Sequence, residues 1–240
     1  MKIFKNTLTD ISDACSEYKI RFAITRFDSF KKSLPSDIDL LITGTDFLKT
    51  INVFNKEGYK SFSHDQALGG RIKGMQINLV KPRRIKIDLH QAFTWRKSKY
   101  FDLKLIWDNL QPTKIEGINI NLPKTDIDAF IVLVNIIFEK TYLNENEFSY
   151  IKRMSKDIFD NQIFGDQALR FGWGNSFEKF KSWFKKSQNR KDYPVFLPFN
   201  LIIYSYWEKF IFDFKIDVIS LLYYLFFRLR FLLNKQLPYE

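Results

Sequence analysis

The stretch Ser36-Asp37-Ile38-Asp39-Leu40-Leu41-Ile42 decides how the first half of the chain folds. Polar and apolar residues alternate at its start and give way to an apolar run, which predicts a β-strand. Successive side chains of a strand point to opposite faces. Asp37 and Asp39 are therefore expected on one face at the start of the strand, while Ile38 and Leu40 face the core.

A second stretch, Ile85-Lys86-Ile87-Asp88-Leu89-His90, predicts another strand of the same kind. By the same alternation, Asp88 and His90 share a face. If the two strands are neighbours in one sheet, three carboxylates converge, because Asp88 then joins Asp37 and Asp39.

This set of carboxylates favours a metal site. Converging carboxylates repel one another strongly unless a cation lies among them. Mg²⁺ takes oxygen ligands, usually a few carboxylates together with substrate phosphates and water. Two such ions, roughly 3.5–4 Å apart, can clamp the attacking and leaving oxygens of an in-line phosphoryl displacement. The third carboxylate can orient and deprotonate the attacking hydroxyl. The pattern therefore predicts Mg²⁺, with two ions possible.

Basic residues separate the two predicted strands and could hold a triphosphate or an anionic acceptor. They are Arg71, Lys73, Lys81, Arg83, Arg84 and Lys86. The simpler interpretation of an Asp-x-Asp pair is solvated strand-end chemistry, and it stays open beside the metal site. A further pair, Asp126-Ile127-Asp128, predicts the start of a helix, where acidic side chains favour the positive end of the helix dipole.

Around these stretches the first half alternates helix and strand, which predicts a mixed α/β domain over residues 1–121. Thr45 is expected to cap the second helix and Gly58 to close it. The predicted helices are 10–18 and 46–56, and the other predicted strands are 20–24, 59–63 and 75–80.

After Pro123 the pattern is nearly all helical, which predicts a helical C-terminal domain over residues 122–240. Thr125 and Asp128 form a candidate capping box at its start. The expected helices are 129–142, one from Asn144 or Asn146 to about 159, one from Asn175 or Ser176 to about 187, and 199–214 packed on 216–234; residues 164–175 are expected to form turns around a short helix. The predicted fold class is thus α/β (α+β), with a mixed sheet flanked by helices and followed by a helical part.

Composition narrows the class of partner. The chain has 38 Lys and Arg against 27 Asp and Glu, a net charge of +11, which favours anionic partners. Its one cysteine, Cys15, excludes a disulfide framework and a Cys-based zinc site and favours a reduced, cytoplasmic compartment. No apolar run reaches the roughly 20 residues of a transmembrane helix. The basic amphipathic stretch 179–191 could be a solvated face, a nucleic-acid patch or a membrane-surface patch.

From about residue 20 to His90 the chain resembles the nucleotidyltransferase superfamily that shares the DNA polymerase β fold, in particular the small nucleotidyltransferases of bacteria and archaea. Asp37 and Asp39 match that family's metal-binding pair, and Asp88, in the similar Asp-Leu-His ending, matches its third carboxylate. The resemblance implies a mixed sheet flanked by helices, with helices appended behind it. It also implies a Mg²⁺-dependent, ATP- or NTP-binding transferase that moves a nucleoside monophosphate to a hydroxyl acceptor and releases pyrophosphate.

One departure from the family pattern lies at Thr25-Arg26, where the family has a Gly-Ser turn against the triphosphate. Arg26 could replace the missing backbone contacts with a charged fork, which makes Thr25, Arg26 and Ser36 the expected nucleotide-binding residues. The alternative is a catalytically inactive relative that only binds its ligand. A third possibility is a nucleic-acid or membrane-surface binding protein that uses the basic patches.

Overall fold

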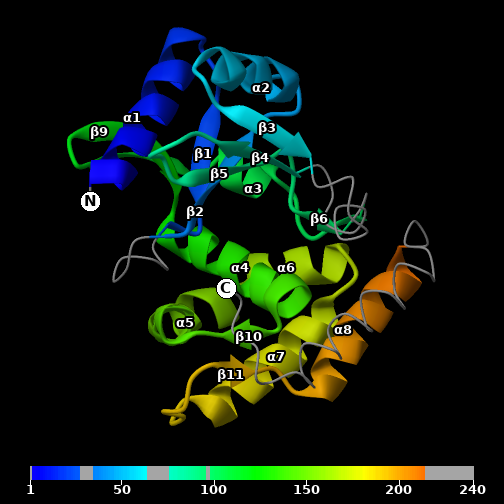
Figure 1. The fold of residues 1–240 in the computed structure, drawn as a ribbon. Helices are drawn as coiled ribbons and strands as arrows, with labels where there is room; N and C mark the ends of the chain where they lie inside the picture. Colours follow the sequence, from blue (N-terminus) through cyan, green and yellow to red (C-terminus); the bar gives the residue numbers. More distant parts are fainter. Residues whose placement is uncertain (1, 28–34, 64–75, 96–97, 214–240) are drawn as a thin grey trace.

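The computed structural model describes residues 2–27, 35–63, 76–95 and 98–213 (Figure 1). The elements, in chain order, are α1 (Lys2–Glu17), β1 (Phe22–Thr25), β2 (Asp37–Ile42), α2 (Phe47–Lys56), β3 (Lys60–Ser63), β4 (Gln76–Val80), β5 (Lys86–His90), β6 (Thr94–Trp95), β7 (Ser98–Lys99), α3 (Lys104–Trp107), β8 (Leu110–Ile115), β9 (Ile118–Pro123), α4 (Thr125–Asn135), η3 (Ile136–Lys140), β10 (Tyr142–Leu143), α5 (Glu145–Phe159), α6 (Gln162–Arg170), α7 (Gly174–Ser187), β11 (Val195–Phe196) and α8 (Phe199–Phe212).

The central element is a five-stranded sheet in the order β1-β2-β5-β4-β3. β2 and β5 are parallel, and every other neighbouring pair in the sheet is antiparallel. The two strands that carry the aspartates are therefore direct neighbours. The predicted fold class, a mixed sheet flanked by helices and followed by a helical part, is confirmed.

One face of this sheet packs on α1 and α2, which lie above it in Figure 1. Ile38 and Leu40 of β2 and Ile87 and Leu89 of β5 are buried in this core, as the alternation predicts. Cys15 of α1 is buried in the same cluster.

The opposite face looks towards α4, which lies below the sheet in Figure 1. Ala23 and Leu41 belong to the core of the helical part, and Phe130 of α4 packs there against Phe164 and Trp173. The sheet is thus covered on both faces, and the polar side chains between Leu41 and the start of β2 lie between the sheet and α4.

Several predicted boundaries were wrong. α1 begins at Lys2 rather than residue 10, because Phe4 and Leu8 continue its apolar stripe into the core. α2 begins at Phe47 with Asp46 as its N-cap and no side-chain cap, so Thr45 does not cap it. Gly58 does close α2, with φ +85°. The short helix expected within residues 164–175 is α6, which begins two residues earlier, and a turn follows it before α7.

The predicted start of α5 at Asn144 is confirmed, with a capping box between Asn144 and Glu147. The hairpin β8–β9 was not predicted, although its turn residues Glu116 and Gly117, both at positive φ, are a hairpin signal. β9 crosses the expected boundary between residues 121 and 122, and the division into domains stays a prediction. The expected helix 216–234 lies outside the described residues.

Candidate active site

Asp39 and Asp88 lie side by side in the sheet. They are partners in the register of the parallel pair β2–β5, and only 2% and 5% of their surfaces are exposed. Asp37 lies two residues earlier on the same face of β2, next to Lys86 of β5. The structure thus brings the three predicted carboxylates to one face of two neighbouring strands.

The polar character of this face extends across four strands. Thr25 of β1 is the register partner of Asp39, and Asn78 of β4 is the partner of Asp88. The order across the sheet is Thr25, Asp39, Asp88 and Asn78. Thr25, Asp39 and Asp88 of this polar row are buried away from water. Their hydrogen bonds and charges must therefore be satisfied by neighbouring groups of the protein or by a ligand.

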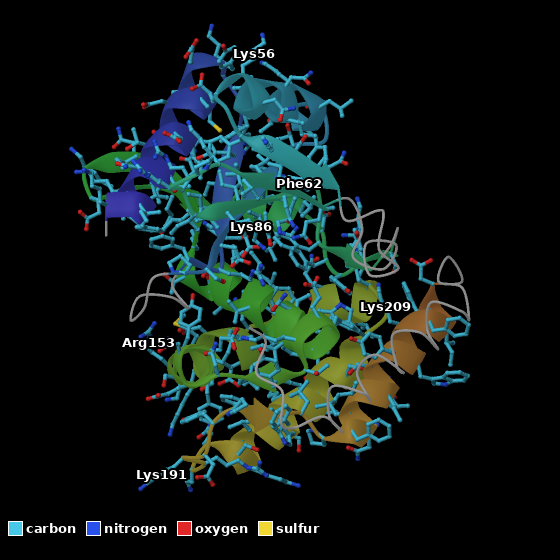
Figure 2. All side chains as sticks on the ribbon, in the orientation of Figure 1. Lys56, Phe62, Lys86, Arg153, Lys191 and Lys209 are labelled. Atoms are coloured by element: carbon cyan, nitrogen blue, oxygen red, sulfur yellow. The ribbon has the colours of Figure 1, made fainter. Side chains whose placement is uncertain are left out.

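Lys86, labelled in Figure 2, pairs with two of the carboxylates. Its Nζ is 3.3 Å from Asp37 Oδ2 and 3.0 Å from Asp88 Oδ1. Burial lowers the pKa of Lys86, but the Asp88 and Asp37 carboxylates outweigh this effect and the net change is an increase. The ammonium therefore stays charged and neutralises part of the acidic cluster.

Arg26 supplies the second cation. Its guanidinium donates to Asp39 Oδ1, and His90 Nε2 lies 3.0 Å from the same oxygen. Burial alone would raise the pKa of Asp39, but the Arg26 charge and the hydrogen bond to His90 outweigh burial and hold that pKa well below its usual range. Asp39 is therefore ionised.

Asp88 has the opposite tendency. Burial raises its pKa, the charges of Asp39 and Asp37 add to the increase, and Lys86 opposes it. A carboxyl group that is buried beside two like charges gains most from a nearby cation.

The backbone at Arg26 is unusual, since its φ is +60°, in the left-handed region that favours glycine. Its N–H donates to Asp128 Oδ1 across 102 residues of sequence. Asp128 is 3% exposed, and its Oδ2 lies 3.2 Å from the hydroxyl of Tyr150. The predicted capping box of Thr125 and Asp128 was therefore wrong: Lys124 is the N-cap of α4, no side chain caps it, and Asp128 binds the end of β1 instead.

Residues 33–149 match a family model that is described as an uncharacterised nucleotidyltransferase. This segment is just under half of the chain. It contains Asp37, Asp39, Asp88 and Asp128, and the family predicted from the sequence is confirmed. Nucleotidyl transfer is the activity that the family's description names.

Three solved structures are similar to this chain at low identity. ANT(2'')-Ia in complex with adenylyl-2''-tobramycin has a TM-score of 0.45 and 9% identity, over 75% of this chain and 95% of that chain. The lincosamide antibiotic adenylyltransferase LnuA, bound to lincomycin, has a TM-score of 0.43 and 15% identity, over 64% and 97%. The nucleotidyltransferase TM1012 from Thermotoga maritima has a TM-score of 0.38 and 14% identity, over 65% and 92%. No curated protein matches the sequence.

Carboxylate and hydroxyl oxygens like those of this polar row are the kind of ligand that a hard cation such as Mg²⁺ takes. Asp39 Oδ2 and Thr25 Oγ1 are buried, and no donor in the described part of the chain hydrogen-bonds to them. No three Asp, Glu, His or Cys side chains among the described residues are arranged to hold one metal ion. Lys86 and Arg26 are instead paired with the carboxylates. A metal at Asp39 and Asp88 would therefore have to replace contacts that these two cations now make.

Some of the other residues predicted for the site lie near the carboxylates and others do not. Ser36 lies at the exposed start of β2, and its Oγ is 3.2 Å from Asp37 Oδ1. Of the basic segment, Lys86 alone among the described members reaches the carboxylates. Arg84 and Lys81 instead bind Asp10 of α1, because the β4–β5 turn lies against that helix. Arg71 and Lys73 lie outside the described residues.

A small cavity next to the polar row was not predicted from the sequence. Arg26 and His90 line it from the sheet, and Asn135 and Glu139 line it from α4 and η3. Asn135 Nδ2 donates to Glu139 Oε2 over 2.8 Å, one turn apart. The π-helical turn η3 is of a form often found at functional sites, and a helical sequence pattern does not distinguish it from an α-helix.

Within the described helices, none has the length and apolarity needed to span a bilayer.

Proposed function

We propose that the protein is a Mg²⁺-dependent nucleotidyltransferase that moves a nucleoside monophosphate from an NTP to a hydroxyl acceptor and releases pyrophosphate. The observation that carries the proposal is the pairing of Asp39 and Asp88 on parallel neighbouring strands, with Asp37 on the same face, inside the segment that matches the family model. A cytoplasmic location, where NTPs are available and Cys15 stays reduced, belongs to the same proposal.

In this proposal Asp37, Asp39 and Asp88 hold Mg²⁺, as one ion or two. The metal, when bound, neutralises charge that develops on the transferred phosphoryl group. Asp88 has a raised pKa, so its carboxylate is the group best suited to take the proton of the acceptor hydroxyl.

The two cations that now neutralise the carboxylates are suited to a second task. Lys86 and Arg26 are long side chains at the edge of the polar row, and an arriving triphosphate carries more negative charge than either aspartate. We propose that both side chains turn to the phosphates when the metal takes their place. Thr25 and Ser36 supply hydroxyl contacts beside them.

The test is a calorimetric titration of the protein with ATP, GTP, CTP and UTP, with and without Mg²⁺. The wild type should bind at least one NTP only when Mg²⁺ is present. Asp39→Asn, which keeps the shape of the side chain but removes its charge, should weaken that binding by about tenfold or more, since a charge-assisted contact is worth about 1.5–3 kcal/mol.

Asp126→Asn is the matched control, because it changes the other Asp-x-Asp pair, whose first member accepts a hydrogen bond from the backbone N–H of Ile127. It should bind like the wild type. A wild type that binds no NTP, or Asp39→Asn that binds as well as the wild type, would overturn the proposed function. Release of pyrophosphate in the presence of small polyols, RNA and protein then screens for the acceptor.

A nucleotide-binding relative without turnover is the second candidate. It is favoured by one observation: Lys86 and Arg26 already neutralise the carboxylates. This candidate predicts NTP binding that does not depend on Mg²⁺ and is not followed by pyrophosphate release. The titration with and without Mg²⁺ separates the two candidates.

A further inference from the structure

Asp128 is a buried carboxylate that does not cap the helix to which it belongs. It lies in the first turn of α4, where acidic side chains usually cap, yet no side chain caps this helix. Its own N–H makes the ordinary helical bond to the Lys124 carbonyl, so Asp128 is a regular member of the helix. Its side chain points out of α4 to the end of β1.

The partner of Asp128 at that point is the backbone of Arg26. Arg26 has left-handed φ, which costs a residue with a side chain roughly 1–2 kcal/mol, and such a conformation persists only where the surroundings enforce it. The hydrogen bond from the Arg26 N–H to Asp128 Oδ1 is a contact that can enforce it. Two elements distant in sequence are thereby fixed at the edge of the polar row.

Through Arg26, this contact links Asp128 of α4 to the carboxylate of Asp39. One residue carries both ends of the link: the Arg26 N–H binds Asp128, and the Arg26 guanidinium binds Asp39. A change in the backbone at residue 26 would swing the guanidinium away from the site. Tyr150 fixes Asp128 in turn, since its hydroxyl lies 3.2 Å from Asp128 Oδ2 and 3.0 Å from the Thr125 carbonyl.

We propose that Asp128 is a positioning residue, which holds Arg26 in the left-handed conformation so that its guanidinium is aimed at the triphosphate of a bound NTP. The inference rests on the proposed function. It assigns to α4, outside the sheet that bears the aspartates, an indirect part in nucleotide binding, through Arg26.

Three variants test the link. Asp128→Ala removes the acceptor. Asp128→Asn keeps it, because the amide oxygen can accept from the Arg26 N–H while the amide nitrogen donates to the Tyr150 oxygen. Asp126→Ala, two residues earlier on the same helix, is the matched control.

The first measurement does not depend on any activity. Hydrogen exchange of the Arg26 amide, followed by NMR, should be slow in the wild type, in Asp128→Asn and in Asp126→Ala. It should be faster by tenfold or more in Asp128→Ala. Equal exchange in Asp128→Ala and the wild type would overturn the link, whatever the protein binds.

The second measurement is Mg²⁺–NTP binding, with kcat and KM where turnover is found. Asp128→Ala should bind NTP about tenfold more weakly and raise KM more than it lowers kcat, and Asp128→Asn should stay within about threefold of the wild type. Loss of binding in Asp128→Asn as large as in Asp128→Ala would overturn the inference, because the charge rather than the geometry would then matter. A wild type that binds no NTP would overturn the proposed function together with the inference, whereas normal binding by Asp128→Ala would overturn the inference alone.

Discussion

Arg26 combines three features that local sequence rules treat separately. Its backbone adopts the left-handed conformation, its N–H binds Asp128, and its side chain neutralises Asp39. A residue with a long side chain thus has the backbone conformation that glycine adopts most readily.

A pair of substitutions at this residue measures the backbone cost. Arg26→Gly and Arg26→Ala both lose the ion pair with Asp39, so the difference between them reflects the backbone. At an ordinary position an alanine variant is more stable than the glycine variant by about 0.4–1 kcal/mol. In the left-handed region, however, the alanine conformation is unfavourable by roughly 1–2 kcal/mol. We expect the glycine variant to be about 0.5–1 kcal/mol more stable in urea denaturation at constant m-value. An alanine variant of equal or greater stability would contradict a left-handed residue 26.

At this scale the sequence predicts where some polar side chains lie and not where others do. The period of two along a strand is enough to place Asp37 and Asp39 on one face and Asp88 with His90. The partners of Lys86 and Arg26 do not follow from any period, because a long flexible side chain selects among all charges within its reach. Asp128 was misinterpreted as a cap because its true partner lies 102 residues away.

At the scale of elements, the helical part contains a buried cation that joins three of them. Lys209 of α8 is 1% exposed, and its Nζ donates to the carbonyls of Lys99 at the end of β7 and of Phe171 after α6. Burial lowers the pKa of Lys209 from its ordinary 10.5 to about 8, although Asp213 opposes the change.

This shift predicts how stability depends on pH. Between pH 8 and 10.5 the unfolded chain keeps the proton of Lys209 while the folded chain has lost it, so the unfolded state binds more protons and the free energy of unfolding rises with pH. The whole window corresponds to about 3 kcal/mol. Below pH 8 both states are protonated, and the cost of burying the ammonium is fully present.

Urea denaturation at pH 7, 8 and 9 measures the effect. Lys209→Met should lose the increase between pH 8 and pH 9 that the wild type shows, because it has no group to titrate there. Lys156→Met, at an exposed position of α5, should keep the wild-type slope. A slope in Lys209→Met as steep as in the wild type would assign the pH dependence to another group.

The boundaries of helices show which structural features a sequence pattern predicts and which it does not. α5 was predicted correctly because its signal is local: Asn144 and Glu147 form the capping box within one turn. α1 was predicted too short, although Phe4, Leu8, Ile11 and Cys15 recur at helical spacing and the sequence alone carries this signal. The turn η3 depends on packing between helices and carries no local signal.

At the scale of the whole molecule, the described residues bury their apolar side chains in two clusters on opposite sides of one sheet. The division runs through single strands. In β2, Leu40 and Ile42 belong to the cluster of α1 and α2, and Leu41 between them belongs to the cluster of α4. Neither cluster can be dismantled without exposing a face of the sheet.

We therefore expect one cooperative unfolding transition. In a variant whose other four tryptophans are replaced by phenylalanine, Trp173, fully buried in the helical cluster, reports on that part by fluorescence, and far-UV circular dichroism reports on the whole chain. The two denaturation curves should coincide in midpoint and m-value. Two separated transitions would contradict the shared sheet and favour the division at residues 121 and 122 that the sequence suggests.

The strand order itself could be predicted only through the resemblance. Period and composition indicate strands near residues 20–24, 37–43 and 84–90, but they do not say which strands are neighbours. That β5 pairs with β2 in parallel, with β1 outside it, depends on how α1, α2 and α4 cover the two faces. This pairing, rather than any motif, brings Asp88 to Asp39.

Cys15 has a practical consequence for studying the molecule in motion. It is the only thiol in the chain, it is 1% exposed, and burial raises its pKa to about 12, so it resists alkylating reagents. The native protein is therefore expected to react little with thiol-specific spin labels or fluorophores. Cysteines introduced at Lys56 and Lys191, exposed at opposite ends of the molecule (Figure 2), would be the two reactive positions. The distance between such labels would report directly whether the sheet and the helices close on each other when a nucleotide arrives.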